Sequence, residues 1–406
     1  MKRKALSPQV ALFAVQVLRV FYADWRDSLC GLLRSSRLSK DGPRIMSTHQ
    51  LYGTWFATYV IGPCLFMLLL VVIATKLGMI RKQLLPDSSQ TASIVQALTR
   101  KAKLVAYGSY FLVLSKDAVS TKDLKRARAN AEELPPNAAT ERHIRLIFVR
   151  HGESVWNYVF NRGFGPSFLV RLLRVTLHEL YLLPFEDSAY LDSPLSEEGL
   201  EQCIKLQAFL RKPCVDLAAS QDFAALTTGE GSSLIVSSQL RRAACTIAIA
   251  LSDRLRRSRE AVVLHSACQE ISRNFDTLAL ALPSCSPPLD AVLEVCAPGA
   301  RFESKANAGN KTLAFRGIAR LEAFATWAAD RPESTIIVGG HSLWFRSFFA
   351  RFLTGEHQAA KRKIVNCGVV ACTLIVARSA SGGVPVQYRI EPSSVTVVYG
   401  GFESKG

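Results

Sequence analysis

Two histidines and two arginines of this 406-residue sequence stand shortly after apolar runs. They are Arg150, His151, Arg242 and His341. A neutral imidazole can attack phosphorus directly, and guanidinium groups match phosphate oxygens with paired hydrogen bonds. A carboxyl group such as that of Glu270 could protonate the leaving oxygen. These residue types indicate phosphoryl chemistry that requires no metal.

Short β-branched runs alternate with helical stretches from residue 142 onward. The runs predict buried strands at Ile144–Val149, Leu234–Ser237, Ala261–Leu264, Thr335–Val338 and Val369–Val376. Helices are expected at Ser196–Lys212, Leu240–Arg259 and Thr312–Ala329, and a loop with some helix at Thr277–Asn310. The alternation predicts a three-layer α/β/α domain with a mostly parallel central sheet. Ligands of such sheets bind beyond the carboxyl ends of the strands, so the polar residues would meet at one edge.

Four motifs occur in a fixed order between residues 146 and 342. They are LIFVRHGESVWN at 146–157, DSPLSEEG at 192–199, SSQLRRAACT at 237–246 and GHS at 340–342. Together they resemble the signature of the histidine phosphatase superfamily, the phosphoglycerate mutase-like proteins. The resemblance covers about residues 142–400 and implies the fold predicted above.

The resemblance also implies a role for each matching residue. His151 would be the nucleophile that becomes phosphorylated, and Glu270 the proton donor, with Asp276 as another acid nearby. Three residues would complete the phosphate pocket, and they are Arg150, Arg242 and His341. Ser154 and Asn157 would line the pocket or brace its loop, while Arg241 would face outward. Arg162, Arg171 and Arg174 could recognise a further anionic group or face solvent.

The four motifs are compatible with three functions. The stretch around Glu270 departs from the pattern of the true mutases, which favours a phosphatase acting on phosphomonoesters of small molecules or proteins. A mutase-type phosphoryl transfer is the second hypothesis. A catalytically inactive docking module is the third, although intact Arg150, His151 and His341 argue against it. No cofactor or metal is expected.

A charge-free stretch in the N-terminal part predicts attachment to a membrane. Phe56–Thr75 holds 20 uncharged residues, and a helix of that length spans a bilayer. The domains expected are a basic segment at 1–55, a transmembrane helix at 56–76, a basic linker at 77–141 that could contact lipid, and the catalytic domain at 142–406.

The charge and the cysteines add two expectations. Of the net charge of +17, most comes from residues 1–140, with 20 basic and 8 acidic residues. A nucleic-acid protein would more often carry such charge on its folded domain, so no nucleic-acid partner is expected. Ten cysteines without a C-x-x-C pair suit reduced thiols and a catalytic domain facing the cytosol. The sequon Asn310-Lys311-Thr312 favours the other side.

Overall fold

The computed structural model describes residues 89–115, 117, 138–214, 219–229, 231–289, 291–379 and 385–404. The chain divides into two compact units, Met1–Pro63 and Cys64–Gly406, and every described residue belongs to the second. Because the described residues begin at Ser89, the predicted span at Phe56–Thr75 lies outside them. Within the described ranges, no helix combines the length and the apolar character needed to cross a membrane.

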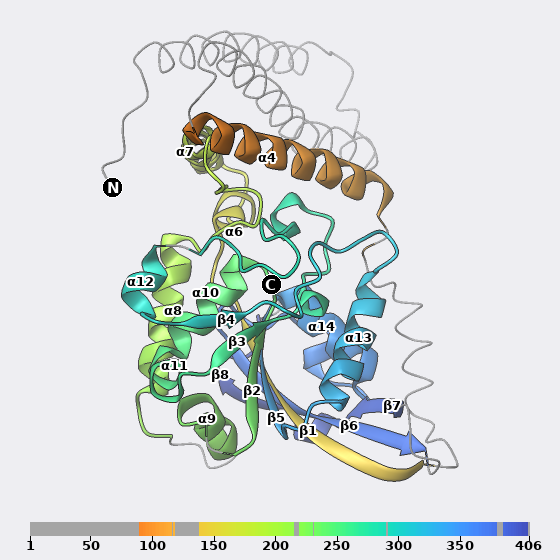
Figure 1. The fold of residues 1–406 in the computed structure, drawn as a ribbon. Helices are drawn as coiled ribbons and strands as arrows, with labels where there is room; N and C mark the ends of the chain where they lie inside the picture. Colours follow the sequence, from red (N-terminus) through yellow and green to blue (C-terminus); the bar gives the residue numbers. More distant parts are fainter. Residues whose placement is uncertain are drawn as a thin grey trace, which may run out of the picture. The chain divides into compact units, whose positions relative to one another are not determined.

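An eight-stranded sheet forms the centre of the described domain (Figure 1). Its strands are β1 (Ala138–Arg150), β2 (Ser233–Ser237), β3 (Ala261–Leu264), β4 (Arg301–Glu303), β5 (Thr335–Gly340), β6 (Val369–Ser379), β7 (Pro385–Ile390) and β8 (Thr396–Tyr399). The order is β4-β3-β2-β5-β1-β6-β7, with β8 pairing β6. Strands β1 to β5 pair in parallel, whereas β6 is antiparallel to β1, β7 and β8. The expected mostly parallel sheet is confirmed, and each of the five predicted strands forms.

Helices cover both faces of this sheet. They are α8 (Glu197–Leu210), α9 (Ser220–Thr227), α10 (Arg241–Ala250), α11 (Ser252–Ser258) and α12 (Val292–Cys296) on one face, and α13 (Gly317–Ala329) and α14 (Ser342–Phe352) on the other. Side chains of β1 alternate between the two layers. Leu146 and Phe148 pack with α13 and α14, whereas Ile147 and Val149 pack with α8 and α10. This alternation accounts for the apolar run Leu146–Val149, because both faces of the strand are buried there.

The helices differ from the sequence predictions within Leu240–Arg259 and in the segment after β1, among other places. The stretch predicted as one helix at Leu240–Arg259 forms α10 and α11, because Leu251 interrupts the helical backbone between them. Two helices without a sequence prediction, α6 (Val155–Phe160) and α7 (Pro166–Leu182), follow the loop after β1. They share a small apolar cluster around Val159 and Phe168, which packs away from the main sheet.

Part of the region expected to be a basic linker is a helix in contact with the domain. Helix α4 (Ser89–Leu114) lies beside α7 (Figure 1), and Lys101 Nζ donates to the Leu182 carbonyl at 2.7 Å. Farther along α4, the Tyr107 hydroxyl donates to the Lys311 carbonyl at 2.6 Å. The apolar residues at Leu104–Leu114 thus belong to a docked helix, while the expected boundaries of the N-terminal regions stay predictions.

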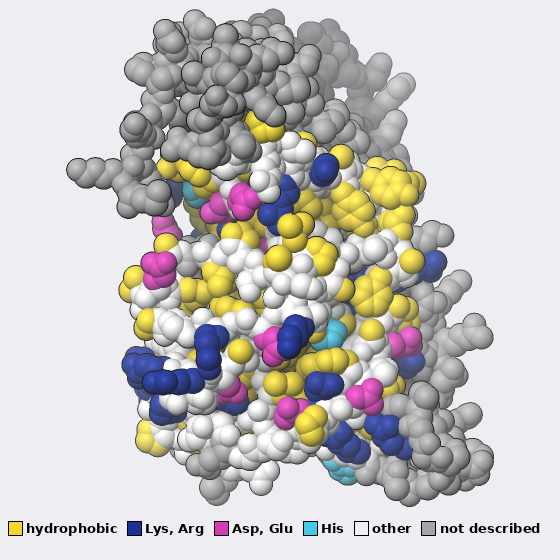
Figure 2. Space-filling model, in the orientation of Figure 1, with side chains coloured by type: hydrophobic (Ala, Val, Ile, Leu, Met, Phe, Trp, Pro, Cys, Tyr) yellow, Lys and Arg dark blue, Asp and Glu magenta, His cyan; other side chains and the backbone are white. Residues whose placement is uncertain are grey.

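The described surface carries charges of both signs. In the face drawn in Figure 2, basic and acidic side chains are interspersed with hydrophobic ones. Exposed ion pairs such as Arg211–Asp253 and Lys361–Glu356 contribute to this mixture. The basic excess of the sequence is concentrated in residues 1–140, most of which lie outside the described ranges.

Candidate active site

The carboxyl ends of β1 and β5 bring the two predicted histidines together. Arg150 lies opposite Gly340 in the parallel register, and the His151 backbone N–H donates to the Gly340 carbonyl at 3.0 Å. The imidazole rings of His151 and His341 are 5.0 Å apart between centroids, with 60° between their planes. Both side chains are buried. The two histidines therefore lie together at the carboxyl ends of the parallel strands, as the sequence predicts.

Two glycines let the loop after β1 lie against the start of α8. A Cβ on Gly152 would meet the Gly199 carbonyl oxygen at 2.5 Å, and a Cβ on Gly199 would meet the Glu153 carbonyl oxygen at 2.0 Å. Both obstacles are backbone atoms, so a larger residue could enter only if the loop moved. The Gly152 N–H donates to Thr246 Oγ1 at 3.1 Å. These contacts fix the position of the neighbouring His151.

The His151 ring is neutral and has a defined tautomer. Its Nδ1 lies 2.6 Å from the Gly152 carbonyl oxygen. A carbonyl can only accept a hydrogen bond, so Nδ1 carries the proton and Nε2 carries the lone pair. Burial, and then the charges of Arg242 and Arg150, lowers the pKa of His151 well below its usual range. Its Nε2 is therefore unprotonated near pH 7, as a nucleophile must be.

His341 is also neutral and has unused hydrogen-bonding atoms. Burial lowers its pKa well below the usual range, and Arg242 and His151 lower it further. The side chain is 0% exposed, yet neither Nδ1 nor Nε2 finds a hydrogen-bond partner among the described residues. A buried polar group left in this state costs about 1–3 kcal/mol. The one N–H of the neutral ring could donate to an oxygen atom of a ligand at this place, which would remove part of that cost.

Arg150 and Arg242 flank the histidines, and each contacts an acidic residue. Arg150 Nη1 donates to Glu403 Oε1 at 2.7 Å. Arg242 Nη1 donates to the Asp276 carbonyl at 2.7 Å, and its Nη2 lies 3.2 Å from the Asp276 carboxylate. The Nε atoms of both arginines are buried and have no partner within the described ranges. Each of the two arginines thus has a buried N–H without a partner, as the His341 ring does.

The predicted proton donor lies in the loop after β3. Glu270 Oε1 accepts from the Ile271 N–H at 2.9 Å and from the Trp344 N–H, in the first turn of α14, at 3.0 Å. Burial raises the pKa of this carboxyl group, and the charge of Arg242 opposes the rise. A raised pKa favours the protonated form, which a general acid requires.

Asp276, the other acid considered, is the ionic partner of Arg242. Burial raises its pKa as well. Its carboxylate, however, lies in an ion pair with Arg242, whereas Glu270 is held by backbone N–H groups. This difference favours Glu270 as the proton donor.

Ser154 and Asn157 shape the turn that follows His151. Ser154 is the N-cap of α6, and its hydroxyl accepts from the Asn157 N–H at 3.2 Å. Asn157 Oδ1 accepts from Asn161 Nδ2 at 3.1 Å. These contacts agree with the bracing role considered for the pair, while contact with a substrate stays a prediction.

The expectation that Arg241 faces outward is wrong. Its side chain is 1% exposed, because the segment after α7 covers this side of α10. The Arg241 N–H donates to Asp192 Oδ1 at 2.9 Å, and its guanidinium contacts Asp187 Oδ1 at 2.5 Å. Helical periodicity separates the faces of Arg241 and Arg242, but it cannot reveal that both faces are covered.

The three arginines considered for a further anionic group have partners within the chain. Arg162 forms a two-point ion pair with Glu153 at 2.8 and 2.7 Å. Arg171 is buried and donates to the Gly163 carbonyl at 2.7 Å. The exposed Arg174 lies 3.5 Å from the Glu197 carboxylate. Arg162 and Arg171 therefore stabilise the segment between α6 and α7.

Some residues that support the site are not part of any motif. Glu403 lies 253 positions from Arg150, and Asn366, whose Nδ2 donates to the His151 carbonyl at 3.1 Å, lies 215 positions from His151. Only the folded chain brings such residues together. Thr246 does have a sequence signal, because it ends the SSQLRRAACT motif.

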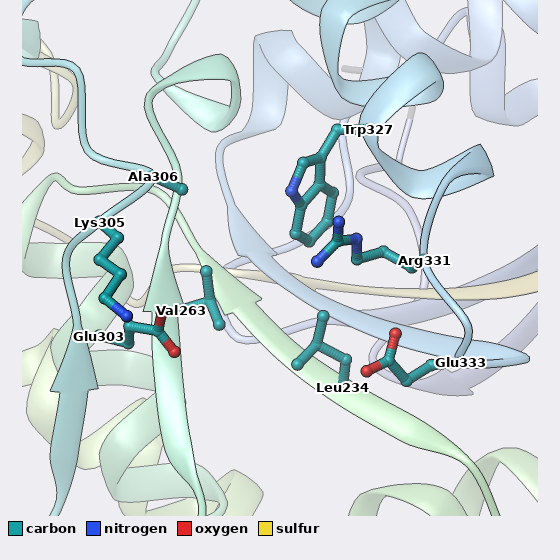
Figure 3. A pocket seen from close by; sticks show the side chains of 8 residues that line it. All are labelled: Leu234, Val263, Glu303, Lys305, Ala306, Trp327, Arg331 and Glu333. Carbon is teal, nitrogen blue, oxygen red and sulfur yellow. The ribbon is translucent and has the colours of Figure 1, made fainter.

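A separate hollow lies away from the histidine pair. It measures about 450 Å³ and is lined by Leu234, Val263, Glu303, Lys305, Ala306, Trp327, Arg331 and Glu333 (Figure 3). The Arg331 guanidinium lies 5.3 Å from the centre of a Trp327 ring. No predicted site residue lines this hollow. Among the described residues, no group of three or more His, Cys, Asp or Glu could hold a metal ion.

Comparisons with known proteins give distant structural matches only. No family model and no curated protein matches the sequence. A structure named mycobacterial hydrolase 1 is 18% identical with a TM-score of 0.32, and the match covers 64% of this chain and 100% of that one. A mycobacterial glucosyl-3-phosphoglycerate phosphatase in complex with VO3 is 18% identical with a TM-score of 0.31. That match covers 61% of this chain and 96% of the phosphatase chain.

A third match is a phosphoserine phosphatase from Entamoeba histolytica in complex with 3-phosphoglyceric acid. It is 15% identical with a TM-score of 0.28, and the match covers 64% of this chain and 98% of that chain. At such values, the activities named for these proteins do not carry over to this chain. The chemistry of the site rests on its own residues.

The lowered pKa values of His151 and His341 predict a pH response. In selectively labelled protein, the NMR signals of both rings should show no titration between pH 7.5 and about 5.5, because protonation is opposed by burial and two arginines. In urea, the unfolded chain should titrate near 6.5. Since the two histidines then bind more protons in the unfolded state below pH 6.5, their contribution to the free energy of unfolding should decrease as the pH falls through that value, while the raised pKa values of Glu270 and Asp276 act in the opposite direction. Variants His151→Asn and His341→Asn assign the signals, and a folded-state titration near 6.5 would refute the neutral pair.

Proposed function

We propose that this protein is a phosphatase that hydrolyses phosphomonoesters through a phosphohistidine at His151. The observation that carries the proposal is the group of buried, unpartnered nitrogen atoms on His341, Arg150 and Arg242 beside a neutral imidazole. An anion with several oxygen atoms could accept hydrogen bonds from the N–H groups of all three side chains. Phosphate has the charge and the acceptor atoms for this role.

The first step forms the phosphoenzyme. His151 Nε2 attacks phosphorus, and the bond between phosphorus and the leaving oxygen breaks. Arg150, Arg242 and His341 donate to the other three oxygens, where negative charge increases in the transition state. Glu270 gives its proton to the leaving oxygen, which departs as an alcohol.

The second step regenerates the enzyme. The Glu270 carboxylate accepts a proton from water as that water attacks the phosphorus of the phosphohistidine. The bond between phosphorus and Nε2 then breaks, and inorganic phosphate leaves. The raised pKa of Glu270 suits a group that first donates and later accepts this proton.

Replacing the nucleophile tests this mechanism. The full-length His151→Ala variant should lose turnover of p-nitrophenyl phosphate by three or more orders of magnitude, since no other described group replaces Nε2. A chelator should leave the wild-type rate unchanged. If His151→Ala keeps the wild-type rate, the mechanism is wrong, and loss of activity with chelator would point to a metal-dependent hydrolase.

The acid role of Glu270 makes a separate prediction. Glu270→Gln should lower kcat/KM, which reports phosphoenzyme formation, for alkyl phosphates such as glycerol 2-phosphate by about 100-fold or more, because general acids typically contribute that much. It should affect kcat/KM for p-nitrophenyl phosphate far less, because nitrophenolate leaves without a proton. Both values of kcat/KM are measured on one preparation, and equal losses for the two substrates would exclude the proposed acid role.

The same assays separate the other two hypotheses. With 3-phosphoglycerate, a mutase would return an isomeric phosphoglycerate, whereas a phosphatase would release inorganic phosphate. A docking module would bind phosphate compounds without turnover. The natural substrate class, a phosphorylated small molecule or a phosphoprotein, follows from comparing such compounds as substrates.

We further propose that Phe56–Thr75 tethers the enzyme to a membrane with the catalytic domain in the cytosol. The charge-free sequence supports the span, and the eight described cysteines are thiols rather than disulfides, which suits a reducing compartment. The Asn310 side chain exchanges hydrogen bonds with the backbone of Ala279 at 2.7 and 3.0 Å. A glycan on this amide would replace one of its two Nδ2 hydrogens and would have to fit beside these contacts, which disfavours the lumenal alternative.

Membrane extraction and protease protection test the tether. In alkaline carbonate the full-length protein should stay with the membrane fraction, because a spanning helix is not released by loss of charge contacts. On sealed vesicles, protease added outside should digest the catalytic domain. Release into the soluble fraction would exclude the span, and a protected, glycosylated domain would reverse the orientation.

A further inference from the structure

A buried ionic cluster lies directly behind the proposed proton donor. Asp117 Oδ2 accepts from Lys311 Nζ at 2.8 Å and from Arg320 Nη2 at 3.0 Å. The side chains are 1%, 0% and 0% exposed respectively. Burying three charges without exact compensation is costly, so a cluster of this kind calls for an explanation beyond stability.

Both cations of the cluster contact the backbone of Glu270. Lys311 Nζ donates to the Glu270 carbonyl at 2.8 Å, and Arg320 Nη2 donates to the same carbonyl at 3.2 Å. Lys311 Nζ also donates to the Ser272 carbonyl. Since the Glu270 carboxyl group is held by two backbone N–H groups, the residue is fixed at both ends.

The charge of Asp117 keeps these two cations in place. Burial, opposed by Asp117 and aided by the neighbouring Arg320, lowers the pKa of Lys311 to about 8. Without the Asp117 carboxylate, the buried cations Lys311 and Arg320 would lose the anion that they share. Lys311 would then lose its proton or move, and in either case its hold on the 270–272 backbone would weaken.

Asp117 comes from outside the segment that resembles a phosphatase. It follows α4, whose last turns contact the loop that carries both acids. The Lys311 ammonium lies 5.1 Å from the Phe111 ring centre, and a Cβ on Gly108 would come within 2.6 Å of the Phe275 ring. Helix α4 therefore sits closely against the 270–277 loop and delivers Asp117 to the cluster.

We infer that Asp117 is a positioning residue for the acid step: through Lys311 and Arg320 it holds Glu270 where it can donate its proton. This inference rests on the proposed function, because it assigns Glu270 the role of general acid. In this inference, α4 and the residues that follow it help to hold the active site in place, although they precede the catalytic domain. Any change that pulls α4 away would then slow proton transfer selectively.

The test compares two substrates with the full-length Asp117→Asn variant. Its kcat/KM for glycerol 2-phosphate, which reports phosphoenzyme formation, should fall about tenfold relative to wild type, because small displacements of a catalytic group have effects of this order or larger. Its kcat/KM for p-nitrophenyl phosphate should change less than about twofold. A purely structural role would lower both values together and leave their ratio unchanged.

Lys101→Met is the matched control on the same helix. Lys101 is a buried cation that donates to the Leu182 carbonyl at 2.7 Å and lies 3.6 Å from Glu179. It anchors α4 through α7 and takes no part in the Asp117 cluster. Its replacement should lower thermal stability while the ratio of the two rates stays that of wild type. If Lys101→Met changes the ratio as much as Asp117→Asn, the specific role of Asp117 is refuted.

A second variant covers the case in which Asp117→Asn fails to fold. Lys311→Met keeps the Asp117–Arg320 pair and removes one of the two donors to the Glu270 carbonyl. It should show the same selective loss on the alkyl phosphate in a milder form. If neither variant changes the ratio while Glu270→Gln does, Asp117 is not a positioning residue and the proposed function is unaffected. If Glu270→Gln leaves the ratio unchanged as well, the acid assignment itself is wrong.

Discussion

Positive charge concentrated in a buried space is the main physical constraint on this domain. Arg150 and Arg242 lie close enough to His151 and His341 to hold the pKa values of both rings well below their usual range. Repulsion of this kind persists in a folded protein only if it is balanced. Glu403 and Asp276 balance it in part, and the nitrogen atoms that remain without partners define where an anion would bind.

The rest of the architecture serves to hold these groups at one edge of the sheet. The parallel register of β1 and β5 sets the two histidines side by side. Close approach of Gly152 and Gly199 fixes the loop after β1, and the Trp344 N–H in the first turn of α14 donates to Glu270. Rigid positions matter because donors stabilise a transition state only if they need not reorganise.

The sequence allowed much of this arrangement to be predicted, and its failures have physical causes. Strands buried on both faces have β-branched runs in the sequence, so they can be predicted. Residues that follow parallel strands meet at the carboxyl ends of those strands, and this rule predicts that His151 and His341 lie together. Burial by distant segments leaves no local signal, so the prediction for Arg241 was wrong and the role of Glu403 was missed. Helix α4 lies within the predicted basic linker, because the sequence does not show that a basic residue such as Lys101 is buried by a contact with distant Leu182.

The phosphohistidine can be observed directly. Full-length protein mixed with a phosphate-labelled substrate, quenched in alkali within one turnover and digested, should yield label on the peptide that contains His151. Phosphoramidate bonds are labile in acid and stable in base, so the label should disappear on acid treatment. A single labelled peptide is expected in the wild type and none in His151→Ala. Label on another residue, or turnover with no covalent intermediate, would contradict a phosphohistidine at His151.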